Sequence, residues 1–128
     1  MFGQRKSSEG WVYVMANASM PQVYKVGKTQ NTPQQRAREL SKATGVPTDF
    51  VVIHARRSPD CHHAERMAHR KLRRYRVNRR REFFKADKHY IARVVDDCCG
   101  AKRMGFSEVM LACVIVGALL GLVGFLVD

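Results

Sequence analysis

The sequence predicts a small α/β domain, in which a short antiparallel sheet of three strands is flanked by helices, followed by one C-terminal transmembrane helix. The 128 residues, 45% of them apolar, suffice for one core but not for two substantial domains. Segments rich in β-branched and aromatic residues alternate with segments of helical periodicity. Residues 109–127 carry no charge, and as a helix of about 28 Å they match the thickness of a bilayer core.

The strands are predicted from composition and alternation. Residues 10–16 (GWVYVMA) and 23–29 (VYKVGKT) are rich in valine and tyrosine, and the turn residues between them are too few for a crossover. They are therefore expected to pair as an antiparallel hairpin. Residues 50–55 (FVVIHA) form the third predicted strand. The pair Phe83–Phe84 is compatible with a further brief strand.

Three helices are predicted between and after these strands. Thr32 and Gln35 have capping-box spacing around Pro33, and Gly45 ends that helix. A second helix is expected from residue 58 to about residue 75, and a third from 88 to 98, since apolar residues recur in both at helical spacing. The predicted organisation is a domain at residues 10–86, a helix and linker at 87–103, and the membrane helix at 109–127.

The charge balance points to a polyanionic partner. Lys and Arg number 23 against 11 acidic residues, a net charge of +12, and residues 66–81 hold nine basic residues and no acid. Such a run repels itself unless phosphates or anionic lipid neutralise it. DNA is favoured because a folded segment separates the run from residues 109–127. Residues expected to contact phosphates are Lys25, Arg73, Arg74, Arg76, Arg79, Arg80 and Arg81.

The uncharged C-terminal segment predicts a single-pass membrane protein. Lys102 and Arg103 flank it on one side, so the positive-inside rule places the N-terminal domain in the cytoplasm. Gly117 and Gly121 form a G-x-x-x-G pattern, which allows close helix approach in lipid and predicts a homodimer contact.

Glu65 and His69 are spaced to share one helix face. A carboxylate there could hold a divalent metal against a phosphate, and the alternative is a surface ion pair beside a partly buried histidine.

Six motifs in order resemble the GIY-YIG nuclease superfamily, and more closely its bacteriophage Orf-172-type DNA-binding branch. The matching text is Gly10-Trp-Val-Tyr-Val14, Tyr24-Lys-Val-Gly-Lys-Thr29, Arg36 with Glu39-Leu40, Thr44-Gly-Val-Pro47 with Phe50, Glu65 with His69, and Glu82-Phe-Phe84. The resemblance covers about residues 10–86 and implies a GIY-YIG-like domain.

The resemblance also implies roles for individual residues. Tyr13 would help activate the attacking water, and Arg36 would stabilise charge developing on the phosphate. Glu65 would hold Mg²⁺ or Mn²⁺. Lys28 and His69 would contact phosphate or orient water, and Lys28 is also expected to lower the pKa of Tyr13. The sequence departs from the family pattern where Lys25 replaces the usual second tyrosine.

The function expected is therefore that of a membrane-anchored protein that binds DNA through phosphate contacts and cleaves it by metal-dependent phosphodiester hydrolysis. Two alternatives stay open. One is DNA binding without cleavage. The other is a non-catalytic membrane-associated module whose basic face binds anionic lipid.

Overall fold

A β-hairpin begins the fold in the computed structural model, which describes residues 6–43, 45–79, 82–100 and 115. Strands β1 (Gly10–Asn17) and β2 (Val23–Thr29) pair antiparallel, with Trp11 opposite Thr29 and Ala16 opposite Tyr24. The predicted hairpin is confirmed.

The sheet has four strands, in the order β3-β1-β2-β4, and not the three that the sequence predicted. Strand β3 (Phe50–Ser58) pairs with β1, and strand β4 (Phe83–Lys85) pairs with residues 23–25 of β2. All pairings are antiparallel. The fourth strand has only three residues, too few to produce a sequence alternation, and it exists because its backbone pairs with β2.

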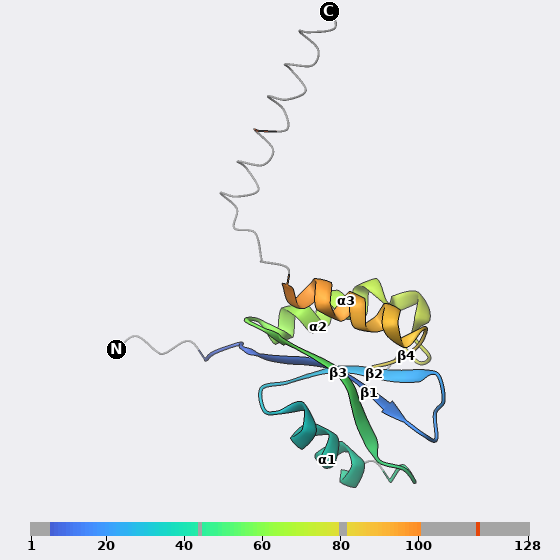
Figure 1. Ribbon diagram of the computed structural model, residues 1–128. Coiled ribbons are helices and arrows are strands. Elements are labelled where there is room, and N and C mark those ends of the chain that lie inside the picture. Colours follow the sequence, from blue (N-terminus) through green and yellow to red (C-terminus); the bar gives the residue numbers. More distant parts are fainter. Residues whose placement is uncertain (1–5, 44, 80–81, 101–114, 116–128) are drawn as a thin grey trace, which may run out of the picture.

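Helix α1 (Pro33–Ala43) covers one face of the sheet (Figure 1). The Thr32 hydroxyl accepts a hydrogen bond from the Gln35 backbone at 3.2 Å, as the capping pattern predicted. A small apolar cluster lies between this helix and the sheet. Its buried members are Tyr13, Met15, Ala37 and Phe50.

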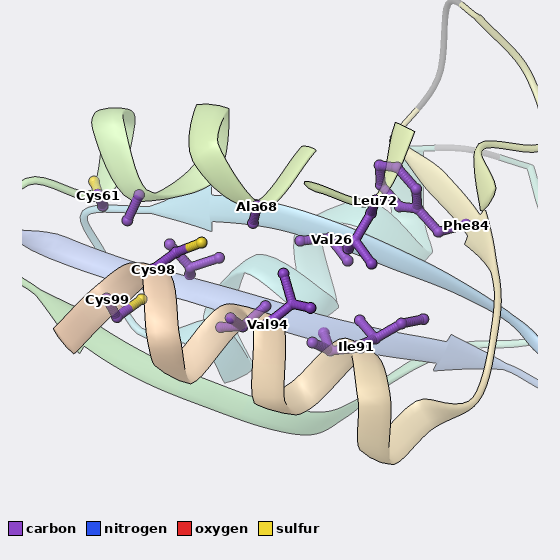
Figure 2. Close-up of a cluster of buried hydrophobic side chains, with 13 residues drawn as sticks. Val26, Cys61, Ala68, Leu72, Phe84, Ile91, Val94, Cys98 and Cys99 are labelled. Carbon is purple, nitrogen blue, oxygen red and sulfur yellow. The ribbon is translucent and has the colours of Figure 1, made fainter. Parts of the chain in front are cut away.

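Helices α2 (Cys61–Lys71) and α3 (Lys88–Gly100) pack together on the opposite face (Figures 1 and 2). They bury the larger apolar cluster, which includes Val26, Leu72, Phe84 and Ile91. The Asp60 carboxylate caps α2 by accepting a hydrogen bond from the His63 backbone, which lowers the pKa of Asp60. Helix α2 is shorter than predicted, because the chain turns at the buried Leu72 into a single 3₁₀ turn, η1 (Arg73–Tyr75).

Among the residues that the structure describes, no helix combines the length and the apolar character needed to cross a membrane. This finding corrects the predicted fold class, which included a transmembrane helix, and the predicted single-pass localisation with a cytoplasmic domain. The fold as described is an α/β domain with four antiparallel strands and three α-helices. Residues 109–127, apart from Ile115, lie outside the described residues, and so do Gly117 and Gly121 of the predicted dimer contact.

Candidate active site

Tyr13 lies on β1 directly opposite Gly27 on β2, and its ring passes across β2 at that glycine. A β-carbon built on Gly27 would lie 2.6 Å from Tyr13 Cζ, closer than any real side chain allows. The ring is 1% exposed. A glycine at position 27 is therefore what lets the Tyr13 hydroxyl reach the outer edge of β2.

Arg36 reaches this hydroxyl from helix α1. Its guanidinium lies close enough to the Tyr13 hydroxyl to influence its pKa through hydrogen bonding and charge, and it also pairs with Glu39 at 3.2 Å. Burial raises the pKa of Tyr13, and Arg36 opposes the rise without cancelling it. The hydroxyl is therefore neutral at physiological pH. The cation that lowers the pKa of Tyr13 is therefore Arg36 and not Lys28, which the sequence had suggested.

Glu65 approaches the same stretch of β2 from helix α2, on the other face of the sheet. The residue is 7% exposed, and its Oε1 lies 3.8 Å from Lys28 Nζ. Burial raises the pKa of Glu65, and the neighbouring Glu82 carboxylate raises it further, while His69 and Lys28 act in the opposite direction. The structure thus places a largely buried carboxylate among cations, with its proton affinity increased.

His69 lies one turn after Glu65 on α2 and binds the edge of the sheet. Its Nε2 donates to the Val26 carbonyl at 2.8 Å, because a carbonyl oxygen can only accept. On the same edge of β2, the Val26 amide donates a hydrogen bond to the Glu82 carbonyl at 3.0 Å. The imidazole therefore occupies the position on β2 that a longer β4 would pair with, and Nδ1 is the ring nitrogen that this hydrogen bond does not use.

Lys25 is not free for a phosphate in this structure. Its Nζ pairs with Glu82 Oε2 at 3.2 Å and lies 5.1 Å from the centre of the Phe83 ring, and its side chain is only 13% exposed. Glu82 is the member of this group that sequence reasoning did not single out. The Glu82-Phe-Phe84 motif was the available signal, since it brings a carboxylate to the start of the strand beside β2.

The predicted phosphate contacts in the basic run separate into three groups. Arg73, Arg74 and Arg79 are exposed. Arg76 is partly buried and stacks over Phe84, with its guanidinium carbon 5.4 Å from the ring centre. Arg80 and Arg81 lie outside the described residues.

A divalent metal at this site would find one buried carboxylate, that of Glu65. Within the described residues, no group of three or more His, Cys, Asp or Glu side chains could enclose a metal ion. Glu65 alone fits Mg²⁺, which commonly binds through one or two carboxylates, with water and substrate phosphate filling the other positions.

Comparison with known protein families gives a match over most of the chain. The model of the T5orf172 domain matches residues 10–99, from the start of β1 to the end of α3. No curated protein and no solved structure matches the chain.

Proposed function

Because the chain belongs to the T5orf172 domain family, we propose that it binds DNA and cleaves phosphodiester bonds at a GIY-YIG-type site. The substrate is DNA held through its phosphates, and the reaction is metal-dependent hydrolysis. Water adds to phosphorus and one ester P–O bond breaks, giving a phosphate end and a hydroxyl end.

One observation carries this proposal. The Tyr13–Arg36 pair and the buried Glu65 reach the same stretch of β2 from opposite faces of the sheet, around Gly27. Phosphodiester hydrolysis needs a cation for the developing charge, a group that orients water and a carboxylate for a metal. The pKa of Glu65 is raised by burial and by the neighbouring Glu82 carboxylate. Carboxyl groups with perturbed pKa values of this kind are concentrated at functional sites, so this environment favours a functional role for Glu65.

Each residue then has a distinct task. The Arg36 side chain, 41% exposed, can donate to the non-bridging phosphate oxygens. The neutral Tyr13 hydroxyl orients the water, and His69 presents Nδ1 to accept its proton. Lys28 positions the Glu65 carboxylate, which would hold Mg²⁺ or Mn²⁺. The ion, when bound, supplies positive charge beside the scissile phosphate.

The test is cleavage of supercoiled plasmid by the full-length chain with Mg²⁺ or Mn²⁺. Glu65→Gln and Arg36→Gln should each slow cleavage about 100-fold, the scale of losing one transition-state contact. Asp97→Asn and Arg93→Gln make the same changes in charge at exposed positions of α3 and should cut like the parent.

Two results would count against the proposal. Cleavage that persists in both Glu65→Gln and Arg36→Gln would place the chemistry elsewhere. Binding without cleavage under either metal would leave a DNA-binding domain without nuclease activity.

A further inference from the structure

A shallow surface pocket of about 550 Å³, open to solvent, lies beside the candidate active site, and its lining is almost entirely cationic. The lining side chains, which we call the arginine pocket, are Arg66, His69, Arg70, Arg73, Arg76 and Arg79. Guanidinium groups donate hydrogen bonds and accept none. The chemistry that fits this lining is therefore an oxyanion.

Among the described residues, the arginines of the arginine pocket form no salt bridge with a carboxylate. Within the described residues, the arginine ion pairs are made by Arg36, Arg56 and Arg57, none of which lines the pocket. Like charges held together repel one another and destabilise the fold unless an anion lies among them. Five arginines around one surface pocket thus create a local preference for a bound anion.

Arg76 is the most tightly held member of the arginine pocket. Its backbone forms an isolated bridge with Phe84, its guanidinium stacks over the Phe84 ring, and its Nη1 donates to the Arg79 carbonyl at 3.3 Å. Its Nε is buried and has no hydrogen-bond partner among the described residues. The guanidinium is thus partly removed from water with a donor unsatisfied, and a nearby anion would offset that desolvation.

The arginine pocket adjoins the candidate active site through two aromatic rings. His69 lines the pocket and also donates to the Val26 carbonyl, one residue before Gly27. Phe84 packs against His69, with ring centres 5.3 Å apart, and also lies under the Arg76 guanidinium. A ligand in the pocket would therefore lie on the α2 side of the active-site edge.

We propose that the arginine pocket is a phosphate-binding subsite, distinct from the position of the scissile phosphate. It holds another phosphate group of the same nucleic acid, either an internal phosphodiester or a terminal phosphomonoester, with Arg76 as the anchor. This inference rests on the proposed function for its substrate class. The inference goes beyond that function because it assigns a second phosphate group to one defined pocket. The charge of residues 66–81 alone would predict only diffuse binding along the basic run.

The pocket is tested first with inorganic phosphate, titrated calorimetrically into the full-length chain at low salt. Arg76→Gln should weaken phosphate binding about tenfold, as expected for losing a charge-assisted contact. Arg70→Gln, at an exposed position that does not threaten folding, should weaken it about threefold. Arg93→Gln removes the same charge outside the pocket and should change the affinity less than twofold.

Three forms of one duplex then distinguish the two sources of phosphate: 5′-phosphate ends, 5′-hydroxyl ends and a closed circle. Equal affinity for all three, lowered by Arg76→Gln, identifies an internal phosphate. A preference for 5′-phosphate ends that Arg76→Gln abolishes identifies a terminal one.

Failure of the subsite and failure of the proposed function look different. If Arg76→Gln and Arg70→Gln bind inorganic phosphate and DNA as the parent does, or if phosphate binds as an adventitious ion only, equally in all variants, the subsite is wrong even when the parent cleaves DNA. If the parent binds phosphate through Arg76 but neither binds nor cuts DNA, the subsite stands and the proposed function fails.

Discussion

Tyr13 fills the space that a β-carbon at position 27 would need, 2.6 Å from its Cζ atom. Gly27→Ala must therefore push the ring away from the edge of β2 or spread the strands. We expect a loss of about 2 kcal/mol of folding free energy, as in other overpacked cores, together with most of the cleavage activity. Urea denaturation and plasmid cleavage measure the two effects. Gly100→Ala, where an added β-carbon meets nothing within 4 Å, should change neither.

Glu65 is expected to lower the stability of the free protein. Its pKa in the folded chain is raised by burial and by Glu82, so the folded state binds the proton more tightly than the unfolded state. Its ionisation therefore destabilises the fold, fully at pH above the raised pKa and progressively less as the pH falls through it. Glu65→Gln should stabilise the protein at neutral pH by about 1 kcal/mol while slowing cleavage about 100-fold. Thermal unfolding measures this, with Asp97→Asn as the control expected to shift little.

The same raised pKa predicts how metal binding depends on pH. A protonated carboxyl does not hold Mg²⁺ or Mn²⁺, so acidification should release Mn²⁺ at a pH above the ordinary range of a glutamate. Titration of Mn²⁺ into the full-length chain at a series of pH values gives the midpoint. Glu82→Gln removes the neighbouring negative charge and should shift that midpoint to lower pH. A midpoint that does not move would mean that Glu82 does not act on Glu65.

Arg36 is expected to act through the planar geometry of its guanidinium group as well as through its charge. The guanidinium pairs with Glu39 while acting on the Tyr13 hydroxyl, and a lysine ammonium cannot reproduce this two-sided arrangement. Arg36→Lys should lower kcat about 100-fold with little change in KM, because the contact matters most as charge develops. Arg38→Lys, on an exposed position of the same helix, should behave like the parent. A loss seen only in KM would indicate a role in ground-state binding alone.

The described cysteines should be unreactive in the native chain. Cys61, Cys98 and Cys99 are buried in the cluster between the sheet and helices α2 and α3 (Figure 2). Burial raises the pKa of all three thiols, that of Cys99 to about 12. At pH 8 almost no Cys99 is in the reactive thiolate form, so iodoacetamide should label it only after denaturation. Peptide mapping by mass spectrometry reads each thiol separately, and rapid native labelling of Cys99 would contradict the packing.

Much of the architecture was predictable because it follows from local signals. The hairpin follows from alternation around a short turn, and α1 begins where Thr32 and Pro33 indicate. β4 was not counted in the predicted sheet because three residues carry no periodicity, and its pairing with β2 is a long-range contact. The end of α2 was misplaced because helical spacing continues through Leu72, whereas the backbone leaves the α-helix at that residue and forms the 3₁₀ turn η1.

The candidate site was less predictable than the fold. The family resemblance selected Tyr13, Arg36 and Glu65, but spacing could not show that they approach β2 from two faces. The engagement of Lys25 with Glu82 was missed because the pair is separated by 57 positions in the chain. Charge counting treated residues 66–81 as one surface, whereas folding places Arg76 over an aromatic ring and leaves Arg74 exposed.

The outer strand β3 is irregular, and this irregularity affects whether copies of the protein can aggregate by pairing their strands. Its pairing with β1 slips by one residue at Val14 and Met15, which leaves Ile53 without a partner in the ladder. Further along the strand, Arg56 and Arg57 have exposed side chains. A strand of a second molecule that paired with β3 would find its row of backbone hydrogen-bonding groups interrupted at this irregularity. If that strand were the β3 of another copy, arginine side chains of the two molecules would also face one another and repel. Growth of fibrils by strand addition is thereby disfavoured at this edge, even though Val51 and Ile53 expose apolar surface beside it.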